Sequence, residues 1–407
     1  MTGFLSSTRL LRVASSTRLL RVAPPLSRRL ARTSSSSSRS PPCVAVLSGS
    51  DALLEADELR GVAEVIHVPV DRWSSVPSDV LQRADAALVW RMSSMADLEA
   101  LSGFERLRVL VRVGVGYDSI DLFAAARSGI AVCNVPAYGV EEVADTAMAH
   151  ILGLYRRTHL LASRVASGAI TSSLNSVVQR EAAGATRVRG QRLGIIGLGR
   201  IGTAVALRAR VFGFSVGFCD PLLPDGADKA LGGLQRFEAV EALLEWSNCV
   251  SLHCTYNPSS RHILDEAALR RLQPGTLVVN TARGGLIDDA ALASALEAGR
   301  LGGAALDCQE VEPEVGDSVY LELLRRHAGA VNLILSPHSS FYSDQSVIQM
   351  RQMASAEARR ALQVRLSGDT SAEVLVGVVT GALRNCVNGA ELTAHAVALR
   401  QRWDLLP

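Results

Sequence analysis

Short apolar runs alternate with amphipathic segments along most of the chain. Glycine, proline or charged residues bound the runs, a pattern typical of strands buried on both faces of a parallel sheet. The segments between them carry apolar residues at helical spacing and predict connecting helices. This alternation favours an α/β fold. The predicted strands span residues 44–47, 64–68, 86–90, 108–113, 131–134, 193–196, 214–219, 250–253, 277–280, 304–307 and 333–336.

The predicted helices differ mainly in length. They span residues 51–59, 140–157, 239–246, 266–272, 289–298 and 345–366, and one more follows Gly199. The helix over 140–157 begins with acidic residues, and we expect it to pass between domains or to pack on a partner subunit. We predict no strand after residue 366. No apolar run reaches the roughly 18 residues of a membrane span, so none is predicted.

A glycine triplet with G-x-G-x-x-G spacing lies between a strand and a helix, at Gly197, Gly199 and Gly202. The first glycine allows a tight turn, the second lets a pyrophosphate approach, and the third lets the helix pack on the strand. The pyrophosphate would lie on the free N–H groups at the start of the helix. The alternative is a glycine-rich turn in another doubly wound sheet.

Asp220 ends the next strand, 18 residues beyond Gly202. Its carboxylate can accept hydrogen bonds from the hydroxyl groups of an adenosine ribose and would repel a 2′-phosphate. Strand, triplet, helix, strand and acid together predict a dinucleotide site that prefers NAD to NADP.

Polar residues follow three later strands, at the edge where a doubly wound sheet binds its ligand. Arg283 precedes two glycines, and its guanidinium can form a bidentate pair with a carboxylate or keto oxygen. Glu312 follows the strand that ends at Asp307, and His338 follows the last strand. A carboxylate beside an imidazole fixes its tautomer and suits it to donate a proton during hydride transfer. Taken singly, the arginine also fits a structural salt bridge, and the histidine a packed loop.

Charge is unevenly placed along the 407 residues. The formal net charge is +2, but residues 1–42 hold eight arginines and no acid, which leaves 34 basic against 40 acidic residues elsewhere. The body is therefore mildly acidic, and no direct nucleic-acid contact is expected. The length and the 48% hydrophobic content suit two globular domains.

Residues 1–42 are arginine-rich, serine-rich and free of acids. The nonapeptide SSTRLLRVA occurs twice there, over residues 6–14 and 15–23. This composition is typical of an organelle transit peptide. An inert disordered tail, or an extended start in front of the true one, fits it equally well.

The seven cysteines predict reduced thiols in a reducing compartment, because they are odd in number and mostly lie in apolar runs. None forms a C-x-x-C pair, so we predict no metal site. The cysteines are Cys43, Cys133, Cys219, Cys249, Cys254, Cys308 and Cys386.

Several motifs in order resemble the D-isomer-specific 2-hydroxyacid dehydrogenases: GLGRIG, NTARGGLID, the Glu-x-Glu-Pro run and the Pro-His pair. Others resemble one branch, the C-terminal-binding proteins (CtBP), which are NAD(H)-dependent transcriptional corepressors. They are RVGVGYDSID, AVCNVPAYGVEEVADT, HILGLYRR and LRNCVN. The resemblance is strong from about residue 107 to 366 and weaker from 43 to 105.

The resemblance implies two Rossmann-like doubly wound parallel-sheet domains of the formate/glycerate dehydrogenase type, with a cleft between them. Residues 43–140 and 337–366 would form the catalytic domain that binds substrate and peptide. Residues 141–336 would form the NAD-binding domain, with tails at 1–42 and 367–407.

The resemblance also assigns roles to residues. Arg283 would bind and polarise a 2-keto acid, Glu312 would support His338, and His338 would be the acid/base. Substrate contacts would fall on Val113, Gly114, Val115, Gly116, Arg283 and Phe341, the last standing where CtBP proteins carry tryptophan. NAD contacts would fall on Gly197, Gly199, Arg200, Ile201, Gly202, Asp220, Cys254, Thr255, Asn257, Thr281, Ala282, Arg283, Asp307 and His338.

The implied partners are a second copy of the chain, bound through the NAD-binding domain, and short repressor peptides of the form Pro-x-Asp-Leu-Ser. NAD(H) would promote tetramers. The implied function is an NAD(H)-binding corepressor of the nucleus and cytoplasm that retains 2-keto acid reduction. The alternative is a metabolic dehydrogenase of a mitochondrion or plastid, with no corepressor role.

Overall fold

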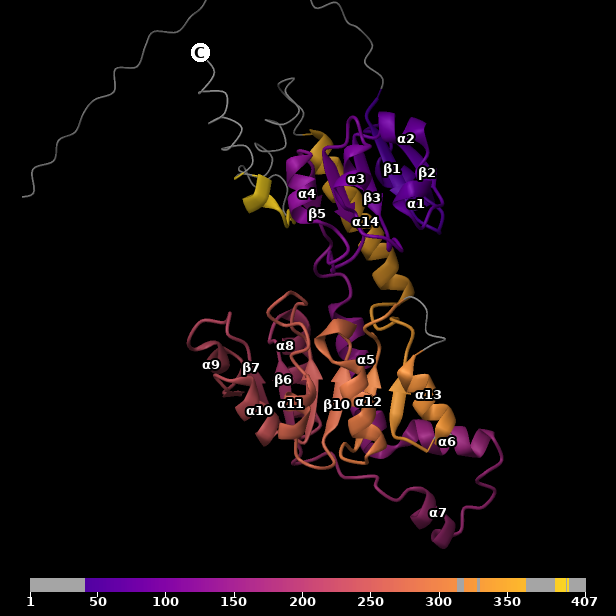
Figure 1. The fold of residues 1–407 in the computed structure, drawn as a ribbon, viewed down its shortest axis with the longest axis vertical. Coiled ribbons are helices and arrows are strands. Elements are labelled where there is room, and N and C mark those ends of the chain that lie inside the picture. The colour runs from indigo at the N-terminus through magenta and orange to yellow at the C-terminus, as the bar shows by residue number, and fades with distance from the viewer. Residues whose placement is uncertain (1–40, 313–317, 328–329, 364–384, 393, 395–407) are drawn as a thin grey trace, which may run out of the picture. The chain divides into compact units, whose positions relative to one another are not determined.

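The computed structural model describes residues 41–312, 318–327, 330–363, 385–392 and 394, and contains two parallel sheets (Figure 1). Of the arginine- and serine-rich segment over 1–42, interpreted as a transit peptide or an inert tail, residues 1–40 lie outside the described residues. No helix in the described ranges is both long and apolar enough to cross a bilayer.

The first sheet has five strands in the order β2-β1-β3-β4-β5, and every pair is parallel. Alternate residues of its strands, such as Val44 and Ala45, belong to two separate buried clusters, because successive side chains of a strand point to opposite faces. The strands are β1 (Cys43–Leu47), β2 (Glu64–Val68), β3 (Ala86–Val89), β4 (Val109–Arg112) and β5 (Ala131–Cys133).

Helices cover both faces of this sheet. Met350 and Ala354 of the late helix α14 share one cluster with β1, β3 and β4, so a segment far along the sequence completes the core of the first sheet. The elements are α1 (Leu53–Glu58), η1 (Trp73–Ser75), α2 (Ser78–Arg83), α3 (Leu98–Ser102), α4 (Leu122–Arg127) and α14 (Asp344–Gln363).

The second sheet has seven strands in the order β12-β11-β10-β9-β6-β7-β8, again all parallel. The strand order reverses between β6 and β9, and ligands of open α/β sheets bind at such a reversal, beyond the carboxyl ends of the strands. The strands are β6 (Arg192–Ile196), β7 (Ser215–Cys219), β8 (Gln235–Arg236), β9 (Cys249–Leu252), β10 (Leu277–Asn280), β11 (Gly303–Leu306) and β12 (Leu333–Leu335).

The helices α5 and α8 pack on one face of the second sheet, and α10 to α13 pack on the other. The elements are α5 (Val140–Arg156), α6 (Thr158–Ala166), α7 (Asn175–Glu181), α8 (Arg200–Val211), α9 (Ala227–Ala230), α10 (Val240–Trp246), α11 (Glu266–Arg271), η2 (Gly284–Leu286), α12 (Asp289–Glu297) and α13 (Val319–Arg326).

The predicted fold class, two doubly wound parallel sheets, is confirmed. The predicted strands all form, and β2 and β10 have the predicted bounds. The sequence analysis missed the short helices α2, α3, α4, α9 and α13, the short strand β8, and α6 and α7, which bury no residue.

Part of the carboxyl-terminal segment lies on the edge of the first sheet. Most of the tail after residue 366, for which no strand is predicted, lies outside the described residues, and in the described part Cys386 makes one antiparallel bridge with Cys133 of β5. Asn388 adds two hydrogen bonds to the same strand edge, accepting from the Val132 N–H and donating to the Ile130 carbonyl, both at 2.9 Å.

Candidate active site

The glycine triplet has the geometry that its spacing predicts. Gly197 has φ +88°, and a Cβ there would lie 2.6 Å from the backbone of Cys254. A Cβ on Gly202 would lie 2.2 Å from the carbonyl oxygen of Gly197, so only glycine lets α8 pack this closely on β6. A Cβ on Gly199 would meet nothing within 4 Å, which leaves open space at the start of α8.

Asp220 directly follows β7 and contacts the glycine loop. Its Oδ2 accepts a hydrogen bond of 2.8 Å from the Leu198 N–H, and its Oδ1 accepts one of 3.0 Å from the Leu222 N–H. The carboxylate therefore fixes the loop. Its oxygens have further lone pairs that can accept from a ribose hydroxyl.

The other predicted cofactor residues lie beside this loop or beyond β9 and β10. Arg200 and Ile201 form the first turn of α8. Asn257 caps the turn after β9, because its Oδ1 accepts from the Ser259 and Ser260 N–H groups. Thr281 is buried, and its Oγ1 has no partner among the described residues. An unpaired buried hydroxyl, open space at Gly199 and a free helix start fit a dinucleotide.

Asp307 directly follows β11 and is buried, and its carboxylate accepts three hydrogen bonds. Its Oδ1 accepts from Ser336 Oγ at 2.6 Å and the Ser339 N–H at 2.9 Å, and its Oδ2 from the Ser340 N–H at 3.0 Å. Its carbonyl also accepts from the His338 N–H at 2.9 Å. Asp307 thereby holds the loop after β12, in which His338 has φ +53°.

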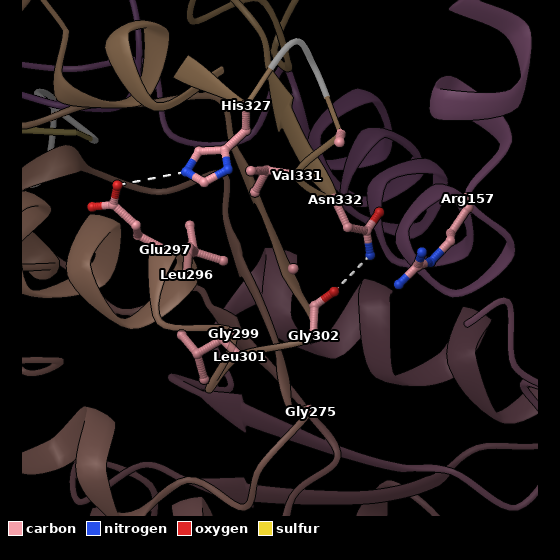
Figure 2. Close-up of a pocket in the computed structure, with 12 residues that line it drawn as sticks. Arg157, Gly275, Leu296, Glu297, Gly299, Leu301, Gly302, His327, Val331 and Asn332 are labelled. Atoms are coloured by element: carbon pink, nitrogen blue, oxygen red, sulfur yellow. Dashed lines mark hydrogen bonds and ion pairs between the residues drawn. The ribbon is translucent and has the colours of Figure 1, made fainter. Parts of the chain in front are cut away.

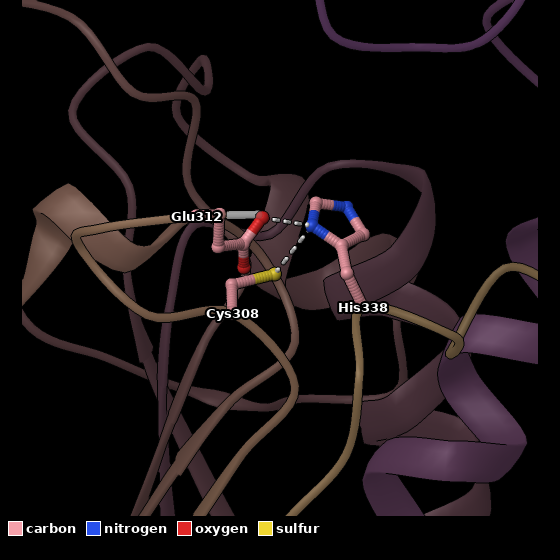
Figure 3. Close-up of side chains that lie close together, drawn as sticks. All are labelled: Cys308, Glu312 and His338. Carbon is pink, nitrogen blue, oxygen red and sulfur yellow. Dashed lines mark hydrogen bonds and ion pairs between the residues drawn. The ribbon is translucent and has the colours of Figure 1, made fainter. Parts of the chain in front are cut away.

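Glu312 and His338 form the predicted pair (Figure 3). Nδ1 of His338 lies 2.8 Å from Oε2 of Glu312. That oxygen also pairs with Nη2 of Arg91 at 2.7 Å, and the Gln309 N–H donates to Oε1. Burial alone would raise the pKa of Glu312, but the His338 ring and Arg91 outweigh it and hold that pKa at about 2. The ionised Glu312 accepts a hydrogen bond from Nδ1–H of His338, which leaves Nε2 of the imidazole to contact a substrate.

Arg283 is partly buried, and a glycine makes room for it. A Cβ on Gly116 would lie 1.4 Å from Nη2 of Arg283. Nη1 of Arg283 donates to the Ala282 carbonyl at 2.7 Å, and the Cys308 thiol donates to the same oxygen at 3.5 Å. Cys308 Sγ lies 3.7 Å from His338 Nδ1, so Ala282 and Cys308 link the arginine to the histidine.

Two further arginines belong to this region and were missed by the sequence analysis. Arg91 follows β3, and Arg112 ends β4 beside Gly114, whose Cβ would lie 2.7 Å from Nη1 of Arg112. Burial lowers the pKa of Arg112 to about 10, with Arg283 and Arg91 acting in the same direction. The sequence does contain a signal for Arg112. Like Arg283, it is an arginine that lies at the end of a buried strand and shortly before a glycine.

Two guanidinium groups therefore lie against the loop 113–116. Arg112 and Arg283 both remain charged at neutral pH and both lie against its glycines. The Val115 carbonyl is held by Asn134 Nδ2 at 2.8 Å. A positively charged loop of this kind suits an anionic substrate.

Phe341 lies beside the pair formed by Glu312 and His338. Its ring centroid is 6.4 Å from that of His338 and 6.2 Å from that of Tyr138, both edge-on. It therefore forms an apolar wall next to the imidazole.

A separate cavity of about 380 Å³ lies at the amino-terminal ends of strands of the second sheet, away from the carboxyl ends that the predicted site residues follow (Figure 2). Gly275, Gly302 and Asn332, which line it, come just before β10, β11 and β12, whereas Thr281, Asp307 and His338 follow those strands. Asn332 donates to the Gly302 carbonyl across its wall at 2.8 Å. None of the predicted site residues lines this cavity.

The reversal of strand order and the glycine loop define a dinucleotide-binding α/β protein. The profile of the D-isomer specific 2-hydroxyacid dehydrogenase NAD-binding domain matches residues 148–340. (S)-sulfolactate dehydrogenase of Chromohalobacter salexigens is 36% identical over 279 residues, which cover 69% of this chain and 85% of that protein. The chain belongs to the D-isomer specific 2-hydroxyacid dehydrogenase family. The predicted enzyme class and the NAD cofactor are confirmed at this level.

Two other relatives bear on the branch and the fold. C-terminal-binding protein 1 of Caenorhabditis elegans is 39% identical over 334 residues, 82% of this chain, and the chain spans 45% of that protein. The crystal structure of D-lactate dehydrogenase from Aquifex aeolicus, complexed with NAD and lactic acid, is 25% identical with a TM-score of 0.68. That match covers 85% of this chain and 99% of the other.

Proposed function

We propose that the chain is an NADH-dependent reductase of 2-keto acids, with Arg283, Glu312 and His338 as its catalytic residues. The observation that carries the proposal is the 2.8 Å contact between Glu312 and His338, linked through Cys308 and Ala282 to a partly buried Arg283. A carboxylate-oriented imidazole and a guanidinium are the groups that carbonyl reduction needs.

The cofactor and the side chains have distinct roles in this reaction. NADH, when bound, supplies the hydride. Arg283 pairs with the substrate carboxylate and polarises its carbonyl. His338, protonated and oriented by Glu312, gives the Nε2 proton to the carbonyl oxygen. The excess of arginines over acids around the loop 113–116 stabilises the developing alkoxide.

The test is NADH oxidation by the purified full-length chain with pyruvate and longer 2-keto acids. We expect turnover that His338→Ala abolishes and that Glu312→Gln lowers by about 100-fold, the lower end of the range for general acid–base catalysis. His327→Ala is the matched control, because His327 lines the cavity at the opposite sheet edge. Full turnover in His338→Ala would disprove the assignment.

Asp220 supports a preference for NAD over NADP. A 2′-phosphate would meet an ionised carboxylate that the backbone N–H groups of Leu198 and Leu222 keep in place. We expect Asp220→Ser to lower the ratio of the activity with NADH to that with NADPH. The same variant should weaken NADH binding, because the Leu198 N–H loses its acceptor. An unchanged cofactor ratio would argue against this role.

A corepressor function is the second proposal, and the 39% identity to C-terminal-binding protein 1 over 82% of this chain favours it. By that likeness the first sheet and its helices would bind Pro-x-Asp-Leu-Ser peptides. We expect fluorescence anisotropy to detect such a peptide, with binding that survives His338→Ala. A peptide with its Asp-Leu pair exchanged for Ala-Ala is the control, and equal binding of both peptides would reject the proposal.

Homodimerisation and location remain proposals. The apolar residues of α5 pack within the chain, whereas α6 and α7 bury nothing and leave Val165 and Leu174 more than half exposed. We propose that a second copy covers this segment. Sedimentation of wild type and Val165→Glu, with and without NADH, tests it.

The location of the protein in the cell can be tested directly. Imaging of a tagged chain would distinguish a nuclear and cytoplasmic location from an organelle.

A further inference from the structure

We propose that Cys308, Glu312 and His338 form an inhibitory Zn²⁺ site within the catalytic pair. One ligand atom from each lies within 4.8 Å of the other two (Figure 3). Thiolate, imidazole and carboxylate are the three protein ligand types that zinc accepts. Binding of Zn²⁺ to these three residues does not depend on the reaction, whereas the inhibition rests on the reductase function proposed above.

The distances fit a tetrahedral ion. With Zn–S of about 2.3 Å and Zn–N of about 2.0 Å, a tetrahedral angle separates the two ligand atoms by roughly 3.5 Å. Sγ of Cys308 and Nδ1 of His338 are 3.7 Å apart. The zinc-bound nitrogen and oxygen would be roughly 3.3 Å apart. Nδ1 and Oε2 of Glu312 are now 2.8 Å apart, so the carboxylate must retreat by about half an ångström.

The ligands are held in place by the fold around them. Cys308 follows β11, is buried and hydrogen-bonds to the Ala282 carbonyl. His338 is fixed by its N–H bond to the Asp307 carbonyl. Glu312 is fixed by the Gln309 N–H. Three protein ligands leave the fourth position of the ion for water, as in open zinc sites.

Binding displaces protons and one cation. The Cys308 thiol releases its proton to solvent, and the neutral imidazole moves its proton from Nδ1 to Nε2. Arg91, whose side chain is 47% exposed, must leave Oε2 of Glu312. Because zinc then occupies Nδ1 of His338, the imidazole cannot become the doubly protonated imidazolium that donates a proton to the substrate. Reduction therefore stops.

The binding test uses Co²⁺ as a spectroscopic substitute for Zn²⁺ on the full-length protein. We expect a thiolate-to-cobalt absorption band that Zn²⁺ displaces and that Cys308→Ser lacks. Cys254→Ser is the matched control, because this half-buried thiol follows β9 outside the cluster, and it should keep the band. A band of equal strength in Cys308→Ser, or no band in wild type, would overturn the site.

The activity test is separate. We expect Zn²⁺ to inhibit NADH oxidation, EDTA to reverse the inhibition, and Cys308→Ser to need at least about tenfold more zinc, as expected for a lost thiolate ligand. Arg91→Gln should bind zinc more tightly, because a competing charge is removed. Cobalt absorption without any reductase activity would reject the proposed reaction but keep the site. Equal zinc sensitivity of wild type and Cys308→Ser would reject the inhibition.

Discussion

Nε of Arg283 donates a hydrogen bond of 3.0 Å to Oδ1 of Asp118, which lies between β4 and α4. The two residues are 165 positions apart in the chain. Burial by itself would lower the pKa of Arg283, but Asp118, with the nearby Cys308 and Glu312, outweighs burial and raises that pKa. Asp118 is thus a positioning residue for the guanidinium that we propose to bind the substrate.

Asp118→Ala should raise KM for 2-keto acids, with kcat/KM falling by about tenfold for a lost charge-assisted hydrogen bond. Asp118→Asn, which keeps an acceptor, should lose less. Asp121→Ala provides the control. It removes the side-chain cap of α4, at a cost of about 1 kcal/mol of stability, and should leave KM unchanged. Equal KM values in all variants would contradict the role of Asp118.

Gly199 and Gly202 should separate cofactor binding from stability. Gly199→Ala meets nothing in the protein, so the thermal midpoint should hold while NAD affinity falls by about tenfold or more through contact with the pyrophosphate. Gly202→Ala forces its Cβ against the Gly197 carbonyl and should cost roughly 2 kcal/mol or more of folding free energy. Calorimetric titration with NAD and denaturant unfolding measure the two effects. Normal NAD affinity in Gly199→Ala would contradict the predicted pyrophosphate position.

His150 predicts a pH dependence of stability. Burial in α5 lowers its pKa, opposed in part by Asp307. The native state therefore holds a neutral ring where the unfolded chain takes up a proton, so stability falls as pH decreases below about 6.5. We expect the difference in unfolding free energy between pH 7.5 and 5.5 to shrink by on the order of 1 kcal/mol in His150→Gln. His327→Gln, at an exposed site, should leave the difference unchanged.

Cys133 and Cys386 should cross-link on mild oxidation. The Asn134 N–H donates to the Asn385 carbonyl and the Val387 N–H to the Val132 carbonyl, which makes the two cysteines a non-hydrogen-bonded antiparallel pair. Such pairs have Cα atoms about 4.5 Å apart, within the range of disulfides. A low-molecular-weight disulfide would take up the two hydrogens of the thiols.

Peptide mass mapping after oxidation measures this link. We expect one disulfide, absent in Cys133→Ser, and a gain on the order of 3 kcal/mol in unfolding free energy from the closed loop. Cys219→Ser is the control and should still cross-link. A fully reduced Cys386 under these conditions would show that the segment does not hold this geometry in solution.

The sequence predicts the strands well because they are buried on both faces. Each residue of β10 is apolar except the last, Asn280, so the run itself marks the bounds. Short helices such as α3 span too few residues for a period of 3.6 to show. In α6 no residue is buried, so no apolar stripe exists to detect.

The chemistry at strand ends is only partly predictable. Arg283, Glu312 and His338 could be selected because each follows a strand of one sheet, and such ends meet at one edge. The contact between Asp118 and Arg283 joins residues associated with different sheets, and no local pattern encodes it. The same holds for Arg91 on Glu312 and for Cys386 on Cys133.

The first sheet and the helix that covers it come from two distant segments of the chain, and this fixes the order in which they are synthesised. Its strands leave the ribosome first, but one covering helix, α14, and the segment at Asn385–Asn388 emerge last. The second sheet, by contrast, is uninterrupted from β6 to β12. We therefore expect the nascent chain to complete the nucleotide-binding half while the earlier half still exposes the apolar surface that α14 will cover, so that a chaperone would engage the amino-terminal strands until translation is nearly finished.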